Sequence, residues 1–192
     1  MNLTFLIPSH TIRTDTKKSV KSVIGGQERV DVLSRCLLNL SRWRGRLDSE
    51  ITLILFLSKP NEQKAFFIPI SSLELNLKSE LDSTLKLIEI LSAPNGTNVY
   101  VENINFNDLI KKITKESKLY YLTPEGSKLS KMKKIKNQKE NSCFVLGSQY
   151  DLTEEQEALL SRMGAIPISI GKKNYLASHV ITIVCHHLFL IK

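Results

Sequence analysis

Two short apolar runs in the last third of the chain each end at a glycine and are each followed by a helical segment. The first run is Phe144-Val-Leu-Gly147 and the second is Ile166-Pro-Ile-Ser-Ile-Gly171, after which residues 177–190 are almost entirely apolar. Strands that alternate with helices form parallel sheets, and α/β proteins bind ligands beyond the carboxyl ends of such strands. The pattern therefore predicts a crevice lined by backbone N–H and C=O groups that suits a nucleotide-like cofactor.

The same alternation continues through the rest of the chain. Residues 79–91 form an amphipathic helix in which Leu81, Leu85, Ile88 and Leu91 share one stripe, while 14–26 and Pro124-Glu-Gly126 are a loop and a turn. Alternating elements indicate an α/β protein with a mainly parallel sheet, and 192 residues suit a single domain over 1–192. The predicted strands are 3–7, 51–57, 65–70, 98–101, 118–122, 143–146 and 166–170, and the other predicted helices are 28–42, 106–114, 153–164 and 177–190.

The charge balance favours an anionic partner. The formal net charge is +8, and 42% of the residues are apolar, which suffices for a real core. Such an excess of positive charge favours RNA or DNA over a membrane, and the alternative is a basic protein whose charge only keeps it in solution. Residues 1–8 lack the pattern of a signal peptide, and the apolar C-terminal stretch is too short to span a bilayer. We therefore expect a cytoplasmic protein without a membrane partner.

The common signatures of nucleotide-binding proteins, hydrolases and metalloproteases are absent from the sequence. Cys185-His186-His187 is a candidate metal cluster, but neighbouring helical residues point in different directions, so packing is favoured and no metal is predicted. The three cysteines, Cys36, Cys143 and Cys185, each lie among apolar residues, which predicts reduced thiols in the core.

Three clusters of charged residues are candidates for binding a nucleic acid. Asp31 and Arg35 are four residues apart on one helical face beside Arg29, so they form either a surface ion pair or a site that holds a base edge and phosphates. The segment Arg42-Trp43-Arg44-Gly45-Arg46 either stacks on a nucleic acid or ends a helix with Gly45 as its cap. Phosphate contacts are predicted from Arg42, Arg44, Lys131, Lys133 and Lys134, the last three from the lysine run 128–139.

Taken in order, short motifs along the chain form a series that resembles a known family. It starts with Gly25-Gly26-x-x-Arg29-Val-Asp31, runs through Pro60-Asn61, Gly96-x-x-Val99-Tyr-Val and Tyr120-Tyr-Leu-x-x-x-Gly126, and ends with Phe144-Val-Leu-Gly147, Thr153-Glu-Glu, Ile168-Ser-Ile-Gly171 and Ala177-Ser-His179-Val-Ile. The series resembles the archaeal tRNA pseudouridine N1-methyltransferases of the SPOUT superfamily. The resemblance covers about residues 5–188, and the order of the motifs carries it rather than any single one.

The resemblance implies a SPOUT fold: a mainly parallel sheet with helices on both faces and a C-terminal deep trefoil knot, an exception to ordinary chain connectivity. It also implies S-adenosylmethionine as methyl donor, a homodimer, and methyl transfer to N1 of pseudouridine 54 in the T-arm of tRNA. Arg29, Asp31 and Arg35 match the pseudouridine-side motif, with Asp31 expected to orient the base or accept its proton and the arginines to stabilise negative charge. The cofactor is expected to be held by Leu146, Gly147, Ser169, Ile170, Gly171, Leu176 and Val180.

The chain departs from the family pattern in the cofactor half. Ser148 and Gln149 follow Gly147 where the family typically has Asp-His, and Lys172 stands where a proline is typical. These differences keep open a non-catalytic RNA-binding protein that retained the fold. A second alternative is the sister group that methylates a pseudouridine of small-subunit ribosomal RNA.

Overall fold

The structure, a computed structural model, describes residues 2–12, 28–47, 49–59, 62–71, 73, 77–94, 97–131, 140–173 and 175–190. The loop predicted at 14–26 and the motifs Gly25-Gly26 and Pro60-Asn61 lie outside the described residues, as do Lys133 and Lys134. Within the described residues, every predicted strand and helix is present, with bounds that differ by a few residues.

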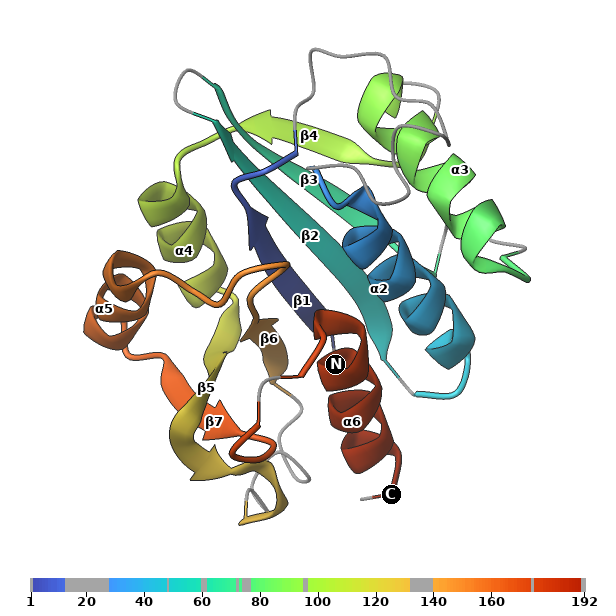
Figure 1. The fold of residues 1–192 in the computed structure, drawn as a ribbon. Helices are drawn as coiled ribbons and strands as arrows, with labels where there is room; N and C mark the ends of the chain where they lie inside the picture. The colour runs from blue at the N-terminus through green and yellow to red at the C-terminus, as the bar shows by residue number, and fades with distance from the viewer. Residues whose placement is uncertain are drawn as a thin grey trace.

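One sheet organises the molecule (Figure 1). It has seven strands in the order β4-β3-β2-β1-β6-β5-β7. The pairs β1–β2, β1–β6, β5–β6 and β5–β7 are parallel, whereas β3 runs antiparallel to β2 and β4. This mainly parallel sheet confirms the predicted α/β class. The strands are β1 (Asn2–Ser9), β2 (Glu50–Lys59), β3 (Glu62–Pro69), β4 (Tyr100–Asn103), β5 (Ser117–Lys128), β6 (Asn141–Val145) and β7 (Ile166–Ser169).

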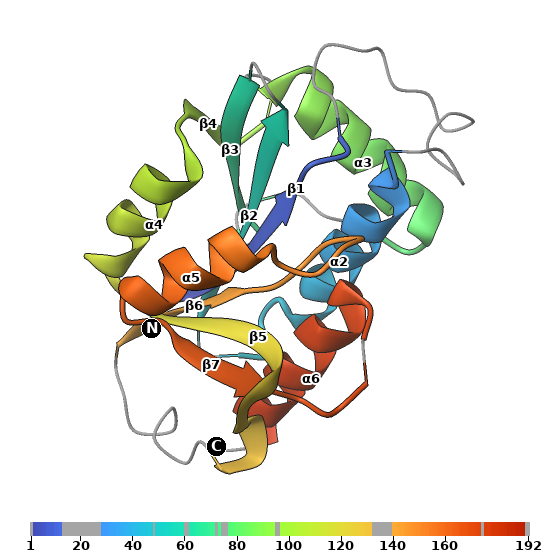
Figure 2. The same ribbon diagram turned by 60° about the vertical axis from the view of Figure 1, so that its left-hand side comes forward.

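Helices cover both faces of the sheet, as predicted (Figure 1 and Figure 2). One face carries α2 (Val30–Trp43), α3 (Glu80–Ser92) and α6 (Ala177–Leu190), and the other carries α4 (Phe106–Thr114) and α5 (Glu154–Arg162). In β1, Phe5 and Ile7 pack in the core on the α2 side and Leu6 packs in the core on the α5 side. Successive side chains of a strand point to opposite faces, so a continuously apolar strand fills both cores.

Two predicted helix ends are confirmed. Thr153 caps α5, where its hydroxyl accepts from the Gln156 N–H at 3.2 Å and the Gln156 side-chain oxygen accepts from the Thr153 N–H at 3.0 Å. This reciprocal pair satisfies two backbone donors that a helix start otherwise leaves unpaired. Gly45 follows the end of α2 with a φ of 71°, the left-handed conformation typical of a helix-terminating glycine.

The helix α3 forms where predicted, but only half of the predicted stripe faces the core: Leu91 is buried and Ile88 packs against the core, whereas the prediction is wrong for Leu81 and Leu85. Leu81 and Leu85 are 51% and 50% exposed, whereas Ser83 and Thr84 are buried against α2. The Ser83 hydroxyl donates to the Ser34 carbonyl at 2.6 Å, and the Thr84 hydroxyl donates to the Ser34 hydroxyl at 3.1 Å. The buried face of α3 therefore combines these two small polar residues, whose hydroxyls are satisfied, with the apolar Leu87, Ile90 and Leu91.

The predicted turn at Pro124-Glu-Gly126 is an irregularity inside β5 instead. Leu122 and Ser127 both pair with Ile168 of β7, so the residues between them bulge out of the ladder. A side chain at Gly126 would place its Cβ only 2.5 Å from the Ile168 backbone, so this close approach requires glycine. The bulge keeps the strand paired on both sides of a sequence that reads locally as a turn.

The cysteines are buried free thiols, as predicted. Burial raises the pKa of Cys36 and of Cys185 to about 12 and also raises the pKa of Cys143. Cys185 lies on the buried side of α6, and the neighbouring His186 ring contacts Trp43 edge-on at 6.4 Å between centroids, so packing accounts for both residues. Within the described part of the chain, no helix is long and apolar enough to cross a membrane.

Candidate functional site

A cavity of about 470 Å³ lies beyond the carboxyl ends of β6 and β7, where the sequence predicts a cofactor crevice. Its walls come from the bulge of β5, the loop 146–151 after β6, residues 170–173 and 175–177 after β7, and the first turns of α2 and α6. Its volume lies in the range of small-molecule sites. The topology therefore brings four distant parts of the sequence to one concave site.

The cavity gathers most of the predicted cofactor residues. Ser169 is the exception, because it does not line the cavity and instead shapes the adjacent turn: its hydroxyl accepts from the Gly171 N–H at 3.2 Å and donates to the Gly171 carbonyl at 3.0 Å. The wall also contains Val32, Tyr150 and Tyr175, which the sequence interpretation did not select. The predicted residues on the wall are Leu146, Gly147, Ile170, Gly171, Leu176 and Val180.

The loop 147–151 is folded tightly onto its first residue. A Cβ at Gly147 would lie 2.4 Å from the Tyr150 carbonyl oxygen and 2.8 Å from Asp151 Cα. Both ends of the loop are anchored, since the Leu146 N–H donates to the Leu6 carbonyl at 3.0 Å and Thr153 caps α5. The missing side chain of Gly147 is thus what allows this wall of the cavity to close.

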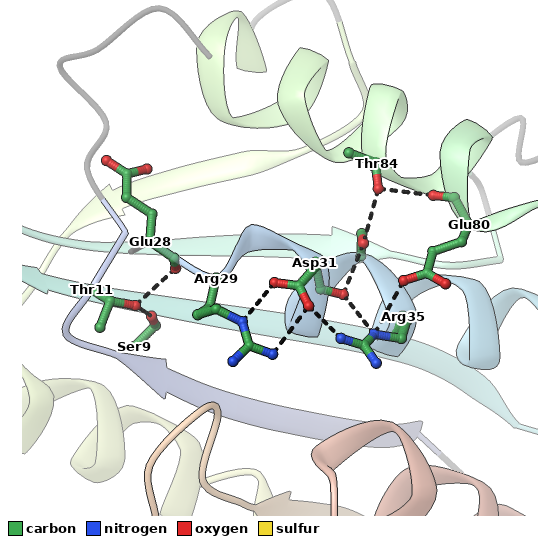
Figure 3. Close-up of polar contacts among 9 residues, drawn as sticks. Ser9, Thr11, Glu28, Arg29, Asp31, Arg35, Glu80 and Thr84 are labelled. Atoms are coloured by element: carbon green, nitrogen blue, oxygen red, sulfur yellow. Dashed lines mark hydrogen bonds and ion pairs between the residues drawn. The ribbon is translucent and has the colours of Figure 1, made fainter. Parts of the chain in front are cut away.

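The predicted catalytic residues form one ion cluster at the start of α2 (Figure 3). Arg29 Nε and Nη2 donate to the two Asp31 carboxylate oxygens at 3.0 and 3.2 Å, and Arg35 Nη2 donates to the same carboxylate. Arg35 Nε also pairs with Glu80 of α3 at 3.2 Å. Of the three, Arg29 lines the cavity, and Asp31 and Arg35 contact Arg29 through the ion cluster without lying on the cavity wall. The ion pair predicted from the helical spacing is therefore present, and it borders the cavity.

The electrostatics of the cluster fix its charge state. Burial raises the pKa of Asp31, but the hydrogen bonds and charges of Arg29 and Arg35 outweigh it and hold that pKa below its usual value. The hydrogen bond and charge of Asp31 in turn raise the pKa of Arg29. A general base works best with a pKa near the working pH. Asp31 therefore suits accepting a hydrogen bond and holding the arginines better than removing a proton.

Arg29 has an unusual backbone. Its φ of 50° makes it the only non-glycine residue with a positive φ among the described residues, and such conformations are sparsely populated and concentrate at functional sites. The Arg29 carbonyl accepts from the Val32 N–H at 3.1 Å, and the preceding Glu28 carbonyl accepts from the Thr11 hydroxyl at 2.9 Å. These contacts hold the turn into α2, and no sequence pattern indicates a left-handed arginine.

Of the residues predicted to contact RNA, Arg42, Arg44 and Lys131 are not on the cavity wall, and Lys133 and Lys134 lie outside the described residues. Arg42 and Arg44 are at the far end of α2, about 20 Å from Arg29 at 1.5 Å of rise per residue. Arg44 Nη1 donates to the Leu73 carbonyl at 2.9 Å, so part of its guanidinium is occupied within the fold. Lys131 is exposed at the end of a short 3₁₀ helix, Leu129–Lys131. A single bound base could not contact both Arg29 and the arginines at the far end of α2.

Comparisons with known proteins identify a family and relatives of the chain. A family whose description reads "Putative SAM-dependent RNA methyltransferase" matches residues 2–191. The protein named tRNA (pseudouridine(54)-N(1))-methyltransferase in Thermococcus onnurineus is 33% identical over 94% of both chains. The protein of the same name in Methanocella arvoryzae is 30% identical over 94% of this chain and 95% of that relative.

A solved structure shares the fold. Archaeoglobus fulgidus Nep1, solved bound to S-adenosylhomocysteine, has a TM-score of 0.64 at 12% identity and covers 100% of this chain and 99% of its own. At such a low sequence identity, the structural similarity is evidence for the fold only. The match over 2–191, together with a relative above 30% identity over nearly the whole chain, confirms the resemblance that the motif series gave. The chain belongs to this family of SAM-dependent RNA methyltransferases.

Proposed function

We propose that the protein transfers a methyl group from S-adenosylmethionine to N1 of pseudouridine 54 in the T-arm of tRNA. The relatives' names state methyl transfer to N1 of pseudouridine 54 of tRNA. One observation carries the proposal: the cavity that gathers the predicted cofactor residues also borders Arg29 of the ion cluster. The donor pocket and the base-side residues are thus neighbours in space, although more than a hundred residues separate them in the sequence.

The residues of the cavity fit S-adenosylmethionine. The loop 146–151, residues 170–173 and residues 175–177 present backbone donors and acceptors, and Leu122, Leu146 and Ile170 add apolar surface for an adenine ring. Gln149 Oε1 is buried without a hydrogen-bond partner among the described residues, so it is an acceptor that a ligand donor would satisfy. When bound, the cofactor supplies a methyl group already activated by its sulfonium charge.

The chain's own residues then position the base. Pseudouridine carries a proton on N1, which must be lost when N1 is alkylated, and correct placement of N1 supplies much of the rate. The ionised Asp31 is suited to accept a hydrogen bond from an N–H of the base. Arg29 and Arg35, which Asp31 holds in place, would stabilise the negative charge that develops on the ring carbonyls. In this assignment the proton leaves to solvent rather than to Asp31.

The substrate RNA would be held by charge as well. Exposed Arg42, at the far end of α2, lies far enough from the cavity to contact a phosphate away from the target base, and Lys131 is a second exposed basic side chain outside the cavity wall. Such contacts release counterions, so the affinity for tRNA is expected to fall steeply as salt rises. An enzyme that acts on tRNA would work in the cytoplasm.

We extend the proposal to the chain path that the family resemblance implies, a single SPOUT domain over residues 1–192 with a C-terminal trefoil knot. The support is the family resemblance, with which the meeting of the loop 146–151, residues 170–173 and the start of α6 at one cavity is consistent. In a knotted chain one of these segments would pass through the loop formed by another, which is an exception to ordinary chain connectivity.

We also propose a homodimer in which α6 contributes to the interface. One side of α6 packs in the core through Val180, Ile181 and Val184. The opposite side is exposed and carries Ile183, which is 37% exposed between polar neighbours. An apolar side chain in the middle of an exposed helical stripe is suited to contact between subunits.

The test of the function is a methyl-transfer assay with two matched RNAs. The protein is incubated with labelled S-adenosylmethionine and a T-arm hairpin that carries either pseudouridine or uridine at the target position, and the nucleosides are identified by mass spectrometry. We expect N1-methylpseudouridine from the first RNA and no product from the second, because uridine has no free N1. A small-subunit ribosomal RNA fragment with pseudouridine tests the alternative substrate, and cofactor binding without transfer to any RNA would favour a non-catalytic protein.

A further inference from the structure

Tyr150 is an exposed aromatic side chain on the wall of the cavity. It is 64% exposed, more than any other large apolar side chain in the described part of the chain. It lines the same cavity as Arg29 and the predicted cofactor residues. An aromatic ring left in solvent beside a polar site has surface available to a ligand with a flat apolar face.

The backbone of Tyr150 is held firmly. Its carbonyl oxygen is the atom that would lie 2.4 Å from a Cβ at Gly147, so the loop is closed onto itself at this residue. The buried Leu152 and the cap of α5 by Thr153 follow directly. The ring is therefore presented from a fixed support rather than from a free loop, which lowers the cost of ordering it when a ligand binds.

Tyr150 also stands close to the ion cluster. The pKa of Arg29 is raised mainly by the hydrogen bond and charge of Asp31, and the Tyr150 phenol adds a smaller contribution of the same sign. Both side chains line the cavity. Single-stranded bases that proteins recognise are splayed out and stacked on aromatic rings or guanidinium planes. The pair of Tyr150 and Arg29 offers both kinds of surface.

A second tyrosine, Tyr175, lines the same cavity and is close in sequence to residues predicted to hold the cofactor. A Cβ at Gly171 would meet the Tyr175 hydroxyl at 2.8 Å, so the Tyr175 ring rests on the turn after β7. Tyr175 is 42% exposed and also lines the cavity. The two tyrosines come from different loops and have different neighbours.

We propose that Tyr150 is the platform on which the extruded target base stacks, and that it acts as a positioning residue in methyl transfer. The inference rests on the proposed function. A base that leaves its helical stack loses contacts with its neighbours, and an aromatic ring in the site replaces part of that loss. Stacking would fix the plane of the base, while Asp31 and Arg29 fix the direction of its edge, so that N1 is aimed into the cavity.

The test compares aromatic and non-aromatic replacements. Tyr150→Phe keeps the ring and should retain kcat/KM for the pseudouridine hairpin within about threefold, whereas Tyr150→Leu and Tyr150→Gln should lower it by about 5- to 150-fold, the range seen when a base loses an aromatic partner. Calorimetry should give the same Kd for S-adenosylmethionine in all three variants. Tyr100→Leu is the matched control, because Tyr100 is 58% exposed but lies on β4 outside the cavity, and it should change neither value.

The outcomes separate this inference from the function on which it rests. A wild-type protein that methylates no pseudouridine overturns both. An active wild type whose Tyr150→Leu and Tyr150→Gln variants retain normal kcat/KM overturns the stacking role alone. Equal losses in Tyr150→Phe and Tyr150→Leu also overturn it, since they would assign the effect to the hydroxyl. Rescue by Phe with unchanged cofactor binding supports it, because a purely structural role would alter both measurements.

Discussion

Replacing Gly147 by alanine should test whether the loop 147–151 forms the cofactor wall. The added Cβ would lie 2.4 Å from the Tyr150 carbonyl oxygen and 2.8 Å from Asp151 Cα, both of them backbone atoms. Ordinary contacts need about 3.5 Å, so the loop must open by roughly 1 Å. It cannot shift as a unit, because Leu146 is bonded to β1 and Thr153 caps α5.

The expected effect has two parts. Overpacking of this kind costs about 1–3 kcal/mol, and at about 2–4 °C per kcal/mol for a chain of this length the melting temperature should fall by roughly 6 °C. A displacement of about 1 Å in a positioning wall can cost about a hundredfold in rate. For Gly147→Ala we therefore expect an increase of about tenfold or more in the Kd for S-adenosylmethionine, measured by calorimetry, and a larger loss of methyl transfer.

Gly164→Ala is the matched control. Gly164 has a φ of 76°, and no atom lies within 4 Å of the position that a Cβ would take there, so alanine meets only backbone strain. That strain costs about 1–2 kcal/mol and should lower the melting temperature by a comparable amount. Cofactor affinity should stay at the wild-type value because Gly164 lies outside the cavity wall. If Gly147→Ala binds S-adenosylmethionine as tightly as the wild type, the loop is not part of the cofactor site and the reasoning is refuted.

Three further predictions concern charge, burial and assembly. Asp31→Asn removes the charge that holds Arg29 and Arg35, so methyl transfer should fall about 100-fold or more while the Kd for S-adenosylmethionine changes by less than about threefold. Because the folded pKa of Asp31 is lowered, its stabilisation is present above the unfolded pKa of about 4 and is lost as the pH falls through the folded pKa. The difference in unfolding free energy between wild type and Asp31→Asn, from urea titrations, should thus be constant down to about pH 5 and shrink in stronger acid; a difference that shrinks near neutrality would contradict the assignment. The three cysteines are buried and burial raises their pKa, so mass spectrometry should find no iodoacetamide adducts on native protein at about pH 8 and adducts on all three after unfolding. Ile183→Glu should convert a dimer to a monomer in light scattering, whereas Leu85→Glu on exposed α3 should not; a dimer that survives Ile183→Glu would exclude α6 from the interface.

Much of the fold follows from local sequence patterns. The apolar run of β1 predicts a strand buried on both faces because both cores need side chains from it. Thr153 and Gln156 predict the start of α5 because the capping contacts are made between residues three apart. Where the partners of a residue lie nearby in the chain, the sequence contains the information needed to place it.

Local patterns fail to predict the structure of a residue where contacts with a segment distant in the sequence determine it. The stripe of Leu81, Leu85, Ile88 and Leu91 predicts the buried face of α3, yet Leu81 and Leu85 are exposed, and Ser83 and Thr84 are buried in the first turns with hydrogen-bond partners on Ser34 of α2. Pro124-Glu-Gly126 reads as a turn, yet it remains in β5 because Ile168 of β7 pairs on both sides of it. In both cases the free energy of a long-range contact exceeds a local preference.

In the candidate site, too, some features follow from the sequence and others follow only from the tertiary structure. The sequence by itself determined the family, the two glycine-ended strands and the ion pair of Asp31 with Arg35, since each depends on order or on short spacing. Only the tertiary structure decided that Arg29 takes a left-handed backbone at the cavity wall and that Tyr150 shares this wall. The physical reason is that a cavity is made by strand ends and loops that meet across the sheet, and no local pattern records which side chains face one another there.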